Sequence, residues 1–365
     1  MEIKQNTLFL TTENTYVNRD HLTLRIEIAK QLVLAVPIHH LESICVFGHS
    51  IALSPSALQL CWEHGVNVNY LSENGYLLGR WEGVPNSSVL LRQAQYRAAD
   101  DVGKTASIAR QCVLGKLNNS RVSLLRSARE TDNEAEKQLL QTCADEISVL
   151  LRRLTHPLDD ELELDETGTL RLPPSALRAA TDRIRGYEGQ AASLYFEVFA
   201  LHLRQQREDF AFTTRSRRPP RDAINCLLSY LYALVRHDCI AALTATGLDP
   251  FVGYLHAVRA NRPALALDLM EEFRPLIADR LAITLINRKQ ITKDDFIFRE
   301  GGTVEFTKAG RKAVITAYQT RKKDTVTHPL LQQECPIGHL YLLQARILAR
   351  HLRGDLEQYL PCVLK

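Results

Sequence analysis

Hydrophobic positions near the start of the chain follow a period of two. Between Leu22 and Ile28 every second residue is apolar, and further runs rich in Val, Leu and Ile flank this stretch. A period of two is typical of a β-strand with one buried face. An Asn-Gly pair within 66–81 favours a tight hairpin turn between two more strands. The pattern over 1–84 therefore predicts a small β-rich domain, with one short helix that begins after Ser54.

From Leu90 onward the apolar positions recur every three or four residues, which indicates amphipathic helices. The change follows a stretch of Gly, Pro, Asn and Ser residues, so a linker is predicted over 85–90. We therefore predict an α+β chain, in which the small β-rich domain is followed by a larger, all-helical domain over 91–365. A Gly-Gly pair at 301–302 indicates one small hairpin there.

Residues 247–273 hold the most informative pattern of the second domain. Asp249 is a good helix N-cap and Pro250 suits a first helical turn, so a short helix is predicted from there to about Val258. After a short connector, Pro263 begins a second helix. If the two helices pair antiparallel, their side chains meet across the connector.

Counted outward from Asn261, His256 lies five residues back and Asp268 seven residues forward. At about 1.5 Å per residue they stand roughly 8 and 10 Å from the connector. Glu271 lies one turn beyond Asp268 and shares its helix face. One imidazole and two carboxylates in this arrangement suit a divalent metal ion. The alternative is a solvated acidic pair beside a structural histidine, which short motifs of this kind also produce.

A second candidate acid, Glu188, lies between Gly186 and Gly189 at the start of a strongly apolar stretch. A glycine inside a helix costs about 1 kcal/mol relative to alanine, so the pair indicates close approach of another helix or backbone. Glu188 would then be crowded and would need a paired charge or a bound cation. Alternatively, Glu188 lies in an exposed first turn, where an acid interacts favourably with the helix dipole.

The segment 204–221 contains six arginines and two acids. Its two prolines predict an irregular, stiff loop, and arginine forks match the geometry of phosphate. An ordinary solvated surface is the alternative. The wider charge distribution favours the second domain as the place where a polyanion binds, because 1–84 carry a net −3 and the rest of the chain a net +6.

Other features bound the class of protein. The eight cysteines form no CxxC pair and lie mostly in apolar surroundings, which favours reduced thiols in a cytoplasmic protein. The first residues lack the order of a signal peptide. The longest apolar region, Leu227 to Leu248, is interrupted by charged residues, so a buried helix or helix pair is predicted there rather than a membrane span.

Three blocks of the sequence resemble a known family: GYEGQAA, RSRRPPRDAINCLLSYLYALV and GLDPFVGYLHAVRANRPALALDLMEEFRP, in this order. They are similar to the CRISPR-associated spacer-acquisition integrases, the Cas-one family of endonuclease/integrases, and most similar to its subtype I-C branch. The resemblance runs through most of the chain. It implies a β-rich amino-terminal domain followed by a helical catalytic domain.

The resemblance also implies a site. The family's metal-binding triad falls on Glu188, His256 and Glu271, which would hold Mg²⁺ or Mn²⁺, and Asp268 matches an accessory catalytic acid. The last metal position is an aspartate in many members and a glutamate here. The implied reaction is a metal-dependent transesterification, in which the 3′-hydroxyl of a short DNA fragment attacks a phosphodiester of a repeat array. The arginines expected to hold the DNA backbone are Arg215, Arg217, Arg218, Arg221, Arg259 and Arg262.

The partners implied are DNA, a second copy of the chain paired partly through the β-rich domain, and the small companion adaptation protein, without a membrane. Two other functions stay open from the residues. One is a stand-alone, structure-selective nuclease of DNA repair, which would use water as the nucleophile. The other is a helical DNA-binding scaffold without catalysis, in which Asp268 and Glu271 face solvent.

Overall fold

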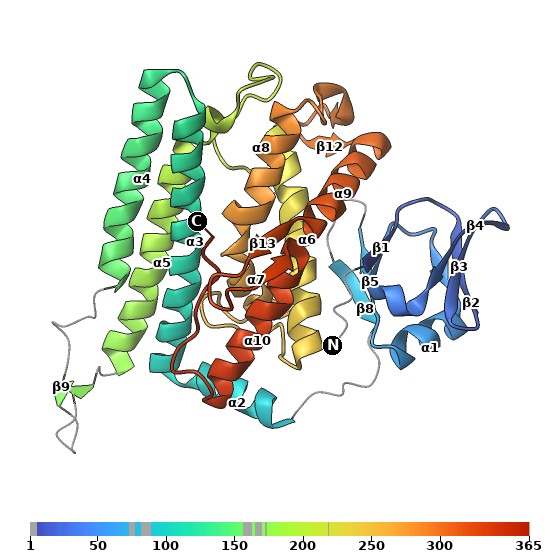
Figure 1. The fold of residues 1–365 in the computed structure, drawn as a ribbon, viewed down its shortest axis with the longest axis horizontal. Coiled ribbons are helices and arrows are strands. Elements are labelled where there is room, and N and C mark those ends of the chain that lie inside the picture. Colours follow the sequence, from blue (N-terminus) through green and yellow to red (C-terminus); the bar gives the residue numbers. More distant parts are fainter. Residues whose placement is uncertain are drawn as a thin grey trace. The chain divides into compact units, whose positions relative to one another are not determined.

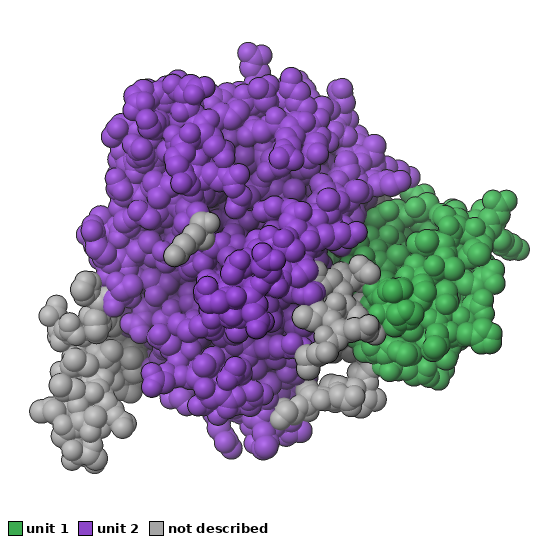
Figure 2. Space-filling view, viewed as in Figure 1, with its two compact units in different colours: residues 1–87 green, residues 88–365 purple. Residues whose placement is uncertain are grey.

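The chain forms two compact units, Met1–Ser87 and Ser88–Lys365 (Figure 2). Their border falls inside the linker predicted over 85–90. The first unit is rich in strands and the second in helices (Figure 1). The computed structural model describes residues 6–72, 77–81, 89–155, 163–164, 170–171, 174–217 and 219–364.

The described part of the first unit contains two four-stranded sheets and helix α1 (Pro55–Glu63). One sheet has the order β1-β5-β7-β8, with its first three strands parallel, and the other has the order β4-β3-β2-β6. The antiparallel pair β7–β8 confirms the predicted hairpin, whose Asn-Gly turn lies outside the described residues. The strands are β1 (Asn6–Leu10), β2 (Thr15–Asp20), β3 (Thr23–Ile28), β4 (Gln31–Pro37), β5 (Leu41–Phe47), β6 (Ala52–Leu53), β7 (Asn67–Leu71) and β8 (Leu77–Trp81).

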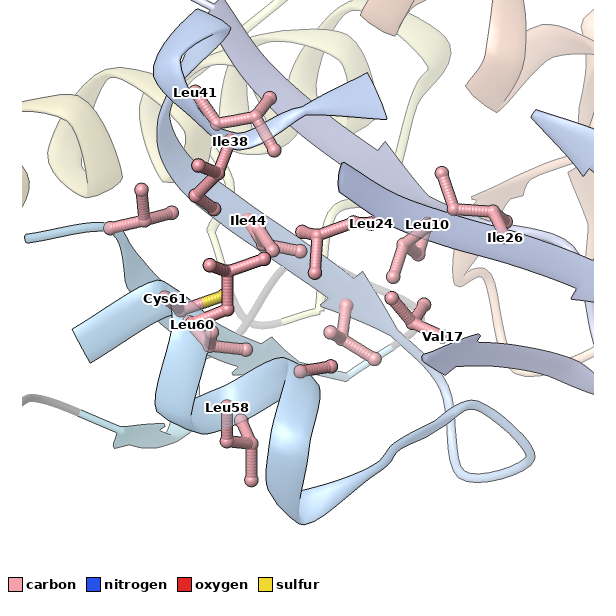
Figure 3. Close-up of a cluster of buried hydrophobic side chains, with 14 of the residues drawn as sticks. Leu10, Val17, Leu24, Ile26, Ile38, Leu41, Ile44, Leu58, Leu60 and Cys61 are labelled. Atoms are coloured by element: carbon pink, nitrogen blue, oxygen red, sulfur yellow. The ribbon is translucent and has the colours of Figure 1, made fainter. Parts of the chain in front are cut away.

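The predicted alternation along the early strands fills one core (Figure 3). Leu24 and Ile26 of β3 are buried there together with Leu60 of α1. Burying a side chain of this size stabilises the fold by about 1.5–3 kcal/mol. The helix begins where expected, because the Ala57 amide donates to the Ser54 hydroxyl over 3.1 Å.

Strand β4 departs from this pattern. It lies at the edge of its sheet, yet Leu32, Val33 and Leu34 are 52%, 59% and 48% exposed. These three side chains therefore stay outside the core of the first unit, whereas Val36 at the end of β4 packs against it.

The second unit is mostly helical, but the all-helical prediction is too strict, because its described residues also form three two-stranded sheets. One of these confirms the hairpin predicted around the Gly-Gly pair at 301–302. The helices are α2 (Val89–Asp100), α3 (Val102–Glu130), α4 (Glu134–Thr155), α5 (Pro174–Glu197), α6 (Ala223–Thr246), α7 (Ala264–Met270), α8 (Arg280–Asn287), α9 (Lys308–Lys323) and α10 (Leu340–Arg353). The sheets pair β9 (Glu163–Leu164) with β10 (Leu170–Arg171), β11 (Phe296–Phe298) with β12 (Val304–Phe306), and β13 (Thr325–Thr327) with β14 (Glu334–Pro336).

Helix α6 is the apolar region predicted to be buried. By length and composition it could cross a membrane, but 78% of its most apolar window is buried inside the protein. It packs against α7 and α10 (Figure 1). Asp222 caps its first turn and Gly247 ends it in a left-handed conformation, with φ of 91°. The buried-helix prediction is confirmed, and the helix supports α7 and the site described next.

Candidate functional site

The loop before α7 replaces the first of the two predicted helices. Residues 249–262 are irregular, and the amides of Tyr254, Leu255 and His256 donate to the carboxylate of Asp268 over 2.6, 3.0 and 2.9 Å. The capping residues Asp249 and Pro250 favour a helix only through their neighbours in sequence. The Asp268 carboxylate of α7 is a stronger acceptor than a backbone carbonyl, and the three amides that it binds cannot also form the hydrogen bonds of a helix.

Gly253 lets this loop lie directly against the start of α7. A Cβ atom at this position would stand 2.6 Å from the carbonyl carbon of Ala264 and 2.6 Å from Asp268 Oδ2. The loop also caps the helix, because the Leu265 amide donates to the Pro250 carbonyl over 3.0 Å. This contact satisfies one of the amides that a helix leaves free at its first turn.

Asp268 also orients the imidazole of His256. Its Oδ1 atom lies 2.7 Å from His256 Nδ1, and its side chain is fully buried. Because this carboxylate accepts the loop amides, it accepts from Nδ1 as well, and the lone pair of the neutral imidazole is then on Nε2. These contacts with backbone and with His256 are those of a residue that orients the histidine, and the catalytic role expected for Asp268 stays a prediction.

Glu271, at the end of α7, contacts two cationic side chains and lies near the imidazole of His256. Its Oε1 atom lies 3.1 Å from Arg274 Nε and 3.7 Å from His256 Nε2, and its Oε2 atom lies 2.7 Å from Lys116 Nζ. Burial alone would raise the pKa of Glu271, but the charges of Arg274 and Lys116 outweigh it and lower the pKa to about 2. The carboxylate is therefore ionised, and because Glu271 is only 3% exposed, the solvated-acid alternative is wrong for this residue.

Glu188 joins the same group through Lys116, whose ammonium donates to Glu188 Oε1. Glu188 lies well inside α5 (Pro174–Glu197), which excludes the first-turn alternative. The glycine interpretation is wrong as well. Gly186 and Gly189 are exposed, and no described atom lies within 4 Å of a Cβ built at either position.

Lys116 and Arg274 are members of the site that the sequence analysis did not predict, and Lys116 carries a signal that could have found it. On α3 it lies one turn from Cys112 and one turn from Ser120, and both of these are buried. A lysine inside such a stripe needs a counter-charge, which is a usable signal. Burial opposes its charge, but Glu271 and Glu188 outweigh burial and raise the pKa of Lys116 above its ordinary value.

The predicted metal ligands Glu188, His256 and Glu271 thus meet in one ion-pair network. Within the described part of the chain, no group of three or more His, Cys, Asp and Glu side chains is arranged to hold a metal ion. The ammonium of Lys116 lies between the two carboxylates instead. Two features still fit a cation. The neutral imidazole of His256 offers the Nε2 lone pair, and the buried Glu271 Oε2 already lies 2.7 Å from a cation, the Lys116 ammonium.

Glu272 holds the end of α7 through a separate set of contacts. It accepts hydrogen bonds from the Tyr359 hydroxyl, from the Cys362 amide over 2.5 Å and from Gln344 Nε2 over 3.2 Å. Burial raises the pKa of Glu272 to about 8. The C-terminal segment therefore fixes the helix end on which Glu271 lies.

Arg215, one of the expected DNA-binding arginines, is turned inward. It donates to Asn225 Oδ1 over 2.6 Å and to Ser229 Oγ over 3.1 Å, and its guanidinium lies 5.3 Å from the centre of the Tyr232 ring. Burial lowers the pKa of Arg215. Its donors are used to fasten the loop to α6, so the expected phosphate contact is corrected for this residue.

The other expected arginines differ from Arg215. Arg217, Arg221 and Arg259 are exposed, Arg262 is half-buried, and Arg218 lies outside the described residues. The loop that carries Arg217 and Arg221 is irregular, as the prolines predict.

A cleft of about 830 Å³ lies between α3, α8 and α9. Its lining carries five cationic side chains and one acid, with threonine hydroxyls among them. Arg126 of the lining and Lys116 of the site lie ten residues apart on α3, which is about 15 Å along the helix axis. The charged lining residues are Arg126, Arg280, Arg288, Lys312, Arg321 and Asp324.

Comparison with known proteins identifies the family of this chain. The family model described as CRISPR associated protein Cas1 matches residues 8–320. A CRISPR-associated endonuclease Cas1 from Moorella thermoacetica is 45% identical over 363 residues, which cover 99% of both chains. Another from Rhodospirillum rubrum is 42% identical and covers 98% of this chain and 97% of that protein.

Solved structures show the same fold at lower identity. A casposase bound to its integration product has a TM-score of 0.77 and 23% identity, covering 98% of this chain and 93% of that one. A Cas1 protein from Thermotoga maritima has a TM-score of 0.76 and 20% identity, covering 99% and 100%. A strand-rich first part followed by a helical second part is thus the fold of Cas1 and casposase proteins. The chain belongs to the CRISPR-associated Cas1 family. The comparisons do not support the finer subtype I-C assignment.

Proposed function

We propose that this chain is a metal-dependent DNA endonuclease and integrase of CRISPR adaptation, which joins short DNA fragments to a repeat array by transesterification. The carrying observation is that Glu188, His256 and Glu271, from distant parts of the chain, meet in one network built around a cation. Its relatives are named endonucleases, and one structural neighbour is described with an integration product.

In this proposal Glu188, His256 and Glu271 hold Mg²⁺ or Mn²⁺. A site with only oxygen ligands prefers Mg²⁺, and the imidazole ligand shifts the preference toward Mn²⁺. Such an ion, when bound, supplies Lewis acidity at a scissile phosphodiester and stabilises charge on the attacking or leaving oxygen. The fit rests on the Nε2 lone pair of the neutral His256 imidazole and on Glu271 Oε2, which already lies 2.7 Å from the Lys116 ammonium.

The chain's own residues prepare these donors. Asp268 holds the His256 ring in one tautomer and one orientation, so that Nε2 is directed toward Glu271. Arg274 keeps Glu271 ionised and is itself fixed over the Tyr232 ring, at 4.6 Å from the ring centre. A donor set fixed in advance in this way needs little rearrangement during a reaction.

DNA would contact the helical unit mainly through its phosphates. The exposed Arg217, Arg221 and Arg259 and the cationic cleft between α3, α8 and α9 provide the positive charge. Contacts of this kind predict affinity that falls steeply with salt and carries little sequence information. The proposal also includes the expectations that the chain forms a homodimer, that it works with the small companion adaptation protein, that it is cytoplasmic and that its system resembles subtype I-C. A Cas6-RT-Cas1–Cas2 complex among the structural neighbours supports the companion.

Strand joining is the direct test. A supercoiled plasmid with a repeat array is incubated with short duplex DNA that carries a free 3′-hydroxyl, with Mn²⁺, and with or without the companion protein. The wild type is expected to give joined products. His256→Ala and Glu188→Ala are expected to lose at least ~100-fold in rate, in line with lost metal ligands, with unchanged circular dichroism. Glu197→Ala, an exposed site on the same helix as Glu188, is the matched control.

The outcomes separate the rival functions. Cutting without joining in all conditions favours the stand-alone nuclease. DNA binding with neither cutting nor joining favours the scaffold. Equal rates in the wild type, His256→Ala and Glu188→Ala discard the proposed site.

A further inference from the structure

A cation that belongs to the chain occupies the centre of the candidate site. The Lys116 ammonium contacts Glu188 Oε1 and lies 2.7 Å from Glu271 Oε2, and only 13% of its side chain is exposed. These carboxylates are the two oxygen ligands of the proposed metal. The lysine and the metal would therefore compete for the same partners.

The Lys116 ammonium lies between Glu188 and Glu271, where a metal held by both carboxylates would also have to bind, and two cations in one place repel strongly in a partly buried site. The neighbouring Arg274 is fixed by Glu271 Oε1 at 3.1 Å and by the Tyr232 ring. Lys116 has a flexible four-carbon stem and a compact ammonium, which can turn away while α3 stays in place. Of the two cations, Lys116 is the one that can leave.

We propose that Lys116 is an exchangeable counter-ion, which holds Glu188 and Glu271 together in the metal-free chain and leaves them when Mn²⁺ or Mg²⁺ binds. Lys116 thereby sets the metal concentration at which the site fills. This inference rests on the proposed metal site and assigns to it a competitor within the chain.

Calorimetric titration of Mn²⁺ into the full-length protein, with its thermal unfolding followed in parallel, tests this role. Lys116→Met removes the charge and keeps the length of the side chain. The Kd for Mn²⁺ should fall at least tenfold. The Tm without metal should also fall, because two carboxylates then face each other without a counter-ion, and the rise in Tm on adding Mn²⁺ should be larger than in the wild type.

Two further variants complete the test. Lys116→Gln should change Kd and Tm in the same directions and serves if the methionine variant does not fold. Lys104→Met removes the same charge from an exposed position on α3 and should change neither quantity.

The results separate this inference from the proposed function. If His256→Ala abolishes Mn²⁺ binding but the Lys116 variants bind within twofold of the wild type, the metal site stands and the counter-ion role is overturned. Weaker Mn²⁺ binding in the Lys116 variants also overturns it, since Lys116 would then support the bound ion. If neither the wild type nor the Lys116 variants bind Mn²⁺, the metal site and the counter-ion role fail together.

Discussion

The buried carboxylate of Asp268 organises several parts of the site at once. It accepts three backbone amides of the preceding loop and the Nδ1 proton of His256. Hydrogen bonds to a charged group contribute about 1.5–3 kcal/mol each, and removing their acceptor leaves buried donors unpaired. At the scale of single residues, the position of His256 therefore depends on one buried acid of the next helix.

Asp279, a second buried carboxylate, gives a prediction about pH. Burial raises the pKa of Asp279 from 3.8 to about 6, although it accepts a hydrogen bond from the Tyr232 hydroxyl over 2.7 Å. A folded-state pKa above the unfolded value contributes stability that is complete below about pH 4 and is lost as the pH rises through about 6. Asp279→Asn stays neutral throughout. The difference between its free energy of unfolding and that of the wild type should therefore increase in favour of the variant between about pH 4 and 7, by up to about 3 kcal/mol.

Urea unfolding at several pH values, followed by circular dichroism, measures this difference. Asp145→Asn, an exposed site on α4, is the control and should track the wild type. Parallel curves for Asp279→Asn and the wild type would show that burial of Asp279 does not penalise its charge.

At the scale of elements, the loop 249–262 and helix α7 form one unit. Pro250 caps the first turn of the helix, and Asp268 of the helix binds the amides of the loop. The two contacts run in opposite directions, so neither element keeps its position without the other. Gly253 is the point of closest approach between them.

Two glycine substitutions with opposite expected effects test this packing. Gly253→Ala places a Cβ atom 2.6 Å from the Ala264 backbone and should destabilise the protein by about 1–3 kcal/mol, as overpacking does. Gly186→Ala, on the exposed face of α5, meets no described atom within 4 Å and should stabilise it by roughly 0.5–1 kcal/mol. Denaturant unfolding gives both values. A neutral Gly253→Ala would mean that the loop shifts freely away from α7.

The elements that depend on local pattern could be predicted from the sequence. Strands β1, β3, β4 and β5, the hairpin β7–β8, the buried helix α6 and the start of α7 after Pro263 all follow periodicity, capping or turn residues, whereas β2 and β6 were not predicted. The helix predicted before Pro263 is absent, because its amides find a carboxylate that belongs to the next element. Local signals do not reveal such a competitor.

At the scale of the whole chain, the site could be predicted only in part. Glu188, His256 and Glu271 do meet in one network, but Lys116 is the residue that joins two of them, and its acids lie 72 and 155 residues further along. The phosphate contact predicted for Arg215 is wrong for a similar reason. Its inward partner Asn225 belongs to a buried helix, and arginine content alone does not distinguish that contact from an exposed phosphate site.

The pairing of two copies of the chain gives the last prediction, and it depends on β4. This edge strand exposes Leu32, Val33 and Leu34, and an unpaired apolar edge readily adds a strand from another chain. Val33→Lys should therefore weaken the proposed homodimer at least tenfold in sedimentation equilibrium. Leu78→Lys, on β8 and 58% exposed, is the matched control and should leave the dimer unchanged. If the wild type is monomeric, the proposed homodimer is wrong. If Val33→Lys dimerises as tightly as the wild type, the interface does not involve β4.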